Sequence, residues 1–171
     1  RKKGQQKFCC LFCYIKRFFV KNKYKGGNFL EKKIKIAVDA MGGDHAPEEI
    51  VKGAIEAVKE MNAHVILVGQ QQAIEEELKK YSYDNTKLEI VPATEIISTD
   101  EVPTVAIRKK KDSSMVVGLN LVKEKKADAF VSAGSTGALL TGALFSVGRI
   151  KGVERPVSGS CLPDKHGFTL L

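Results

Sequence analysis

The segment that most constrains the fold of this chain is residues 34–47, where a short apolar run leads directly into a turn with two glycines. Ile34 and Ile36 belong to a partly β-branched run that is typical of a strand buried inside a parallel sheet. The run ends at Asp39. Pro47 is suited to the start of a helix because its fixed φ is helical and its missing N–H is not needed there. The sequence therefore predicts a strand, a loop and a helix in succession.

The same alternation continues along the chain. Apolar runs predict further strands over residues 64–68, 88–91 and 128–133. Apolar residues at helical spacing predict helices over residues 47–61, 71–81, 115–122 and 138–147, and a helix start near residue 103 interrupts this rhythm. The helix at 138–147 is apolar almost all round, which predicts that it is buried. Alternation at this spacing is typical of an α/β fold with a parallel sheet and right-handed crossovers.

The net charge of +8 is distributed unevenly. Residues 1–33 hold 11 lysines and arginines and one acid, whereas residues 34–171 hold 17 basic and 19 acidic residues. A basic surface for nucleic acid would therefore have to lie in the N-terminal segment, and the rest of the chain predicts no nucleic-acid partner. Three of the four cysteines are also in that segment, which argues against a disulfide framework and for a reducing compartment. No run approaches the length of a membrane span.

The N-terminal segment, residues 1–29, is unlike the rest of the chain in composition. A signal peptide would need a longer apolar region and a cleavage site with small residues. An interfacial helix is an alternative, because apolar residues recur there at helical spacing beside basic ones. A metal site is weaker, since its three cysteines lack a fourth ligand nearby. We favour a segment that is not natively translated: residues 25–27 can be encoded by a purine-rich ribosome-binding sequence and Leu30 by a TTG start codon, which makes 30–171 the domain.

Two glycine-containing turns are candidates for a binding site. In open α/β sheets, ligands bind at the carboxyl ends of strands, where Asp39, Gly42, Gly43 and Asp44 follow the first predicted strand. A tight, well-capped turn without a ligand is the alternative for this segment.

The second turn, residues 134–137 (GSTG), follows the predicted strand 128–133 and begins an apolar helix. Free backbone N–H groups, two hydroxyls and the positive end of the helix dipole together make an anion site. The turn is neither a Walker loop nor the dinucleotide pattern G-x-G-x-x-G. Alone, it is also compatible with a capped turn and no more.

Residues 108–111 form a run of four basic side chains. Such a run is most often a solvated face. A position beside a binding site would instead make it a contact for phosphate or for a carrier protein. Ser113 or Ser114 is expected to be the N-cap of the helix that follows.

Four blocks in the same order resemble the bacterial phosphate acyltransferases of phospholipid synthesis, the PlsX family. The blocks are DAMGGDHAP at 39–47, IRKKKDSSM at 107–115, ADAFVSAGSTGAL at 127–139 and GVERP at 152–156. The resemblance runs from about Lys33 to the end of the chain. It implies a Rossmann-like three-layer α/β fold, with helices on both faces of a parallel sheet, related to phosphotransacetylase and isocitrate dehydrogenase folds.

The resemblance also implies an activity and partners. Members move a fatty acyl group from acyl carrier protein to inorganic phosphate, giving acyl phosphate, and use no cofactor or metal. They are homodimers of the cytoplasm with peripheral membrane association. Two departures stand out: Ser135 replaces an asparagine that is frequent in the family, and the chain stops inside a predicted strand at 168–171, where members continue. The chain is thus expected to be the N-terminal half, with doubtful catalysis by itself.

The resemblance and the chemistry together suggest roles for the site residues. Phosphate or oxyanion contacts are expected from the backbone and hydroxyl groups of the second turn and from a supporting cation. Asp39 and Asp44 are expected to orient backbone amides or a base, since a carboxylate repels phosphate. The expected phosphate-binding residues are Gly42, Gly43, Ser132, Gly134, Ser135 and Thr136, with Arg108 or Lys111 as the cation.

Two other functions stay open at the level of sequence. An enzyme that takes acyl-CoA in place of the carrier protein could use the same sheet. A non-catalytic binding module is the other, with the basic N-terminal segment as its contact to a membrane or to nucleic acid.

Overall fold

A computed structural model describes residues 34–61 and 63–154 in full, and the backbone alone of residues 161–164 and 167–170. The expectations for residues 1–29 and their cysteines lie outside these residues, as does the end of the GVERP block. Nothing in the structure tests them.

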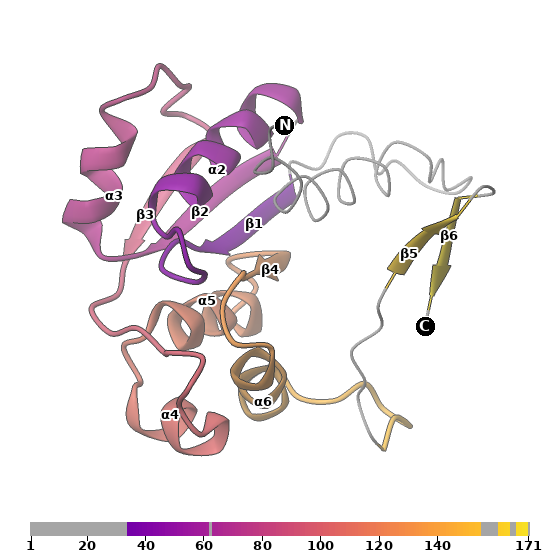
Figure 1. Cartoon of the computed structure of the whole chain (residues 1–171). Coiled ribbons are helices and arrows are strands. Elements are labelled where there is room, and N and C mark those ends of the chain that lie inside the picture. The colour runs from indigo at the N-terminus through magenta and orange to yellow at the C-terminus, as the bar shows by residue number, and fades with distance from the viewer. Residues whose placement is uncertain (1–33, 62, 155–160, 165–166, 171) are drawn as a thin grey trace, which may run out of the picture.

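Strands and helices alternate through the described residues (Figure 1). The strands β1 to β4 form one sheet in the order β3-β2-β1-β4, and each pair in it is parallel. Strands β5 and β6 pair with each other as an antiparallel hairpin. The elements are β1 Ile34–Asp39, α2 Glu48–Glu60, β2 Ala63–Gly69, α3 Gln71–Leu78, β3 Leu88–Pro92, α4 Pro103–Lys109, α5 Ser114–Lys123, β4 Ala129–Val131, α6 Thr136–Ser146, β5 Cys161–Asp164 and β6 Gly167–Leu170.

Helices cover both faces of the parallel sheet (Figure 1). On one face, Ile55 of α2 and Ile74 of α3 pack with Leu67 of β2 in one core cluster. On the other face, Leu121 of α5 packs with Ile66 of β2. A third cluster joins α5 to α4 and α6, and these two helices lie outside α5. The three-layer α/β fold is therefore confirmed.

Helix α6 differs from its prediction. Its sequence is apolar on every side, yet only Ala138 and Gly142 are buried. Leu140 keeps 38% of its surface exposed and Phe145 keeps 57%. The reason is position: α6 contacts α4 and α5 on one side, and within the described residues nothing covers the other. The prediction of a buried helix is thus wrong for α6. In the residues that the structure describes, no helix combines the length and apolar character that a membrane span needs.

Gly118 in the middle of α5 is explained by its contact with β4. Glycine is a poor helix former, so its place there is not accounted for by the local sequence. A Cβ on Gly118 would lie 2.1 Å from Cε2 of Phe130, well inside van der Waals contact. The missing side chain makes room for the aromatic ring between α5 and the sheet.

The start of α5 confirms the predicted serine cap. Ser113 is the N-cap, and its Oγ accepts a hydrogen bond from the N–H of Val116 at 3.4 Å while donating to the carbonyl of Lys110 at 2.8 Å. Ser113 also forms a parallel bridge with Glu95. These contacts fix the segment that follows α4 against the segment that follows β3.

Candidate anion-binding site

The two glycine-containing turns meet at the carboxyl ends of β1 and β4. The chain order along the sheet reverses at this pair, since β2 and β3 lie on one side of β1 and β4 on the other. In open α/β sheets, such a switch point is where ligands bind. The loop after β1, residues 40–47, and the second turn, residues 134–137, therefore lie together although they are far apart in the sequence.

Gly42 and Gly43 allow this close approach. A Cβ on Gly42 would lie 2.6 Å from Oδ2 of Asp39 and 2.9 Å from the backbone nitrogen of Gly134. Gly43 has a φ of +106° and faces Ala133, whose Cβ would lie 3.3 Å from a Cβ on Gly43. The first glycine is needed for space and the second for its backbone conformation.

Asp39 connects the two loops through its carboxylate. Only 2% of its surface is exposed. Its Oδ1 accepts a hydrogen bond from the N–H of Met41 at 3.1 Å, and its Oδ2 accepts one from the hydroxyl of Ser132 at 2.7 Å. The Oγ of Ser132 in turn accepts from the N–H of Gly134 at 3.0 Å. A continuous chain of hydrogen bonds thus runs from the second turn to the end of β1.

Ser135 caps α6 and is largely buried. Its Oγ accepts a hydrogen bond from the N–H of Ala138 at 3.3 Å. In the described part of the chain, no hydrogen bond uses the backbone N–H of Ser135, Thr136 or Gly137. Thr136 is exposed. Three backbone donors and one hydroxyl at the positive end of α6 are therefore left for an anion.

The two residues predicted as the cation that supports phosphate binding, Arg108 and Lys111, have different surroundings. Arg108 stacks over the ring of Phe145, with Cζ 5.5 Å from the ring centroid. Phe145 lies nine residues along α6 from Thr136, which is about 13 Å at the rise of an α-helix. Lys111 is exposed and precedes Met115, whose Cε lies 3.6 Å from the position of a Cβ on Gly134. Among the described residues, no hydrogen bond or ion pair joins the side chain of Lys111 or of Arg108 to the second turn.

Within this basic run, the side chain of Lys110 has local structural contacts. Lys110 pairs with Glu101 at 2.7 Å and also donates to the carbonyl of Ile96. The hydrogen bond from Lys110, with one from the N–H of Ser98, lowers the pKa of Glu101. The hydroxyl and N–H of Thr94 similarly lower the pKa of the neighbouring Asp112. These contacts hold the loop before α4 in place.

Asp44 does not share the environment of Asp39. It lies in the same loop but is exposed, whereas Asp39 is enclosed by the two loops. The link from Asp39 to Ser132 spans 93 residues and was not expected from the sequence. The available signal was that both residues lie at the carboxyl end of a predicted strand, but their meeting depends on which strands pair.

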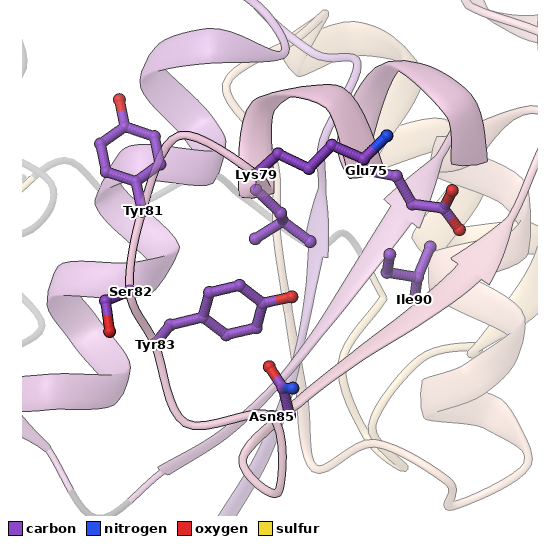
Figure 2. A pocket seen from close by; sticks show the side chains of 8 residues that line it. Glu75, Lys79, Tyr81, Ser82, Tyr83, Asn85 and Ile90 are labelled. Atoms are coloured by element: carbon purple, nitrogen blue, oxygen red, sulfur yellow. The ribbon is translucent and has the colours of Figure 1, made fainter.

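A hollow of about 560 Å³ lies away from this site (Figure 2). The side chains that line it come from α3, the loop that follows and β3, and they include Glu75, Lys79, Tyr83 and Ile90. Strand β3 is at the edge of the sheet, two strands away from β1. None of the residues expected from the sequence to form the site lines this hollow, so the two features are separate.

Residues 34–171 match a family described as "Fatty acid synthesis protein". The chain is 54% identical over 138 residues to the phosphate acyltransferase of Alkaliphilus oremlandii and 55% identical over 139 residues to that of Clostridioides difficile. Each match covers 81% of this chain and 41% of the relative, so the chain spans about two fifths of their length.

A solved structure of a phosphotransacetylase from Streptococcus pyogenes resembles this fold. The TM-score is 0.54 at 23% sequence identity, and the match covers 77% of this chain and 42% of the other. At this identity, the likeness concerns the fold alone.

Proposed function

Because this chain belongs to the fatty acid synthesis protein family, we propose that it forms the N-terminal part of a phosphate acyltransferase. The enzyme transfers a fatty acyl group from acyl carrier protein to inorganic phosphate, and the acyl phosphate enters phospholipid synthesis. The observation that carries this proposal is the set of unused donors at residues 135–137, beside the loop that follows β1.

The proposed reaction needs oriented donors more than a nucleophilic side chain. A phosphate oxygen forms a bond to the thioester carbonyl carbon, the C–S bond breaks, and the leaving thiolate takes up the proton that the hydrogen phosphate dianion gives up. The enzyme has to hold the phosphate dianion against the carbonyl and stabilise the oxyanion that develops. The N–H groups of residues 135–137 and the hydroxyl of Thr136 are suited to hold the dianion, and we propose Arg108 or Lys111 as the supporting positive charge.

We propose the partners on the basis of the same family membership and reaction. The acyl donor is an acyl carrier protein, and the enzyme is a cytoplasmic homodimer with peripheral contact to the membrane. The exposed apolar side chains of Val105 on α4 and of Leu140 and Phe145 on α6 support a partner on this side of the fold. Arg108, which stacks on Phe145, adds positive charge there.

A second candidate is an acyl-CoA-using phosphotransacylase, because the unused donors at residues 135–137 would hold phosphate in the same way for either thioester. The two are distinguished by the donor. We expect the protein, expressed through its full native reading frame, to form acyl phosphate from acyl carrier protein and phosphate at least about ten times faster than from acyl-CoA. The readout is acyl phosphate trapped as its hydroxamate. Faster reaction with acyl-CoA would replace the first proposal by the second, and no reaction with either donor would contradict both.

Replacement of Thr136 by valine is expected to raise the KM for phosphate about tenfold, because a hydrogen bond to a charged group contributes about 1.5 kcal/mol or more. Valine keeps the shape of threonine and removes the hydroxyl. The measurement is the initial rate of acyl-phosphate formation against phosphate concentration.

Thr141→Val is the matched control, since Thr141 lies five residues further along the same helix. We expect its KM for phosphate to stay within about twofold of wild type, because a hydroxyl away from the anion loses no contact with it. An unchanged KM for phosphate in Thr136→Val would remove Thr136 from the phosphate site.

A further inference from the structure

The loops at the site are joined just beyond the last backbone pair of their strands. The register of β1 and β4 runs from Ile36 opposite Ala129 to Val38 opposite Val131. The next residues are Asp39 and Ser132, and their side chains form a hydrogen bond of 2.7 Å. A side-chain contact thus continues the connection where the backbone ladder stops.

The carboxylate also fixes the direction of this hydrogen-bond chain. An ionised carboxylate only accepts hydrogen bonds, whereas a hydroxyl has one proton and two lone pairs. The single proton of Ser132 therefore goes to Asp39, and the Oγ of Ser132 receives the N–H of Gly134. In this arrangement neither the hydroxyl proton of Ser132 nor the N–H of Gly134 is available to a bound anion.

We propose that Asp39 is a positioning residue for phosphate, acting through Ser132 on the peptide of Gly134. This inference rests on the proposed function. It reassigns Ser132 and Gly134 from phosphate contacts to groups that orient the turn, and it leaves the contacts to residues 135–137. The peptide of Gly134 leads directly into these donors, so its orientation sets where their N–H groups point.

A role as general base fits Asp39 less well. Its carboxylate is buried and accepts hydrogen bonds from Met41 and Ser132 through its two oxygens. Phosphate in its dianionic form already has an oxygen with a free electron pair, so attack on a thioester needs no base. A carboxylate in contact with phosphate would repel it, and the link through Ser132 lets Asp39 act without that contact.

The test is a double-mutant cycle with Asp39→Asn and Ser132→Ala in the protein expressed through its full native reading frame. Asparagine keeps the shape of Asp39 but brings an N–H donor to Ser132, which removes the fixed direction of the hydrogen bonds. Each single variant is expected to raise the KM for phosphate about tenfold. The KM for the acyl donor should stay within about twofold.

The double variant decides whether Asp39 acts through Ser132. We expect its KM for phosphate to match that of the single variants, because both changes break the same chain of hydrogen bonds. If the two effects multiply instead, Asp39 acts independently of Ser132 and the proposal is overturned. It is also overturned if neither single variant changes the KM for phosphate.

Ser132→Thr is the conservative variant, because it keeps the hydroxyl and Ser132 is only half-buried. It should bind phosphate like wild type. If it behaves like Ser132→Ala, the hydroxyl is not the group that matters. This pair also tests the proposal should Asp39→Asn fail to fold, and thermal unfolding of every variant identifies such a failure.

Phosphate binding measured by titration calorimetry separates this inference from the proposed function. A wild-type protein that binds phosphate but forms no acyl phosphate would contradict the proposed reaction. The same titrations on the variants would still show whether Asp39 and Ser132 position the anion. Equal phosphate affinity in wild type, Asp39→Asn and Ser132→Ala would overturn the positioning role whatever the enzyme activity.

Discussion

Replacement of Gly42 by alanine is expected to lower kcat/KM for phosphate by about 100-fold, because a shift of about 1 Å in positioning groups costs this much in rate. The new Cβ would lie 2.9 Å from the backbone nitrogen of Gly134 and 2.6 Å from Oδ2 of Asp39. A backbone nitrogen cannot rotate away as a flexible side chain does. The loop after β1 and the turn after β4 therefore have to separate, and the donors of the turn move with them.

The measurement is the rate of acyl-phosphate formation against phosphate concentration in the protein expressed through its full native reading frame. His45→Ala is the control, since His45 is an exposed residue of the same loop. Its rate should stay within about twofold of wild type, because removal of an exposed side chain rarely disturbs its surroundings. Near-normal kcat/KM in Gly42→Ala would show that the two loops need not approach this closely.

Replacement of Gly118 by alanine is expected to lower the free energy of unfolding of this chain by about 1–3 kcal/mol, the usual cost of overpacking. Helix propensity alone predicts the opposite, a gain of about 1 kcal/mol for alanine in place of glycine. The ring of Phe130 decides between them, because its Cε2 would lie 2.1 Å from the new Cβ. Urea denaturation followed by circular dichroism measures the change.

A second substitution tests the cause of this loss. Phe130→Leu removes the ring, so Gly118→Ala in that background should no longer be destabilising. Asn120→Ala, in the same helix, is the control and should change stability by no more than about 0.5 kcal/mol, as helix propensity allows. A stabilising effect of Gly118→Ala in the wild-type background would mean that the ring moves aside at little cost.

The order of strands and helices was predictable from local patterns, but their limits were not. The strand predicted over residues 128–133 is confined to Ala129–Val131, because β4 pairs with β1 at three positions only. The helix predicted over residues 71–81 ends at Leu78, where the chain turns toward β3. Periodicity shows which residues are apolar, whereas the ends of an element depend on its partners.

The burial of α6 shows the same limit in another form. Its apolar sequence predicted a helix enclosed on all sides. Yet Phe145 near its end and Val147, which directly follows it, are both exposed. Hydrophobicity records how favourable burial of a side chain would be. It does not record how many neighbours are present, which only the packing of α4 and α5 against one side of α6 shows.

The sequence by itself determined the chemical groups of this protein's candidate site: two glycine turns, a carboxylate at the end of a strand, and serine and threonine at a helix start. Each is a local feature, because conformational freedom, capping and the helix dipole depend on neighbours in the chain. Only the tertiary structure decided that Asp39 meets Ser132 and that Gly42 meets Gly134. These contacts follow from the pairing of β1 with β4, and strand order is set by the packing of the whole sheet.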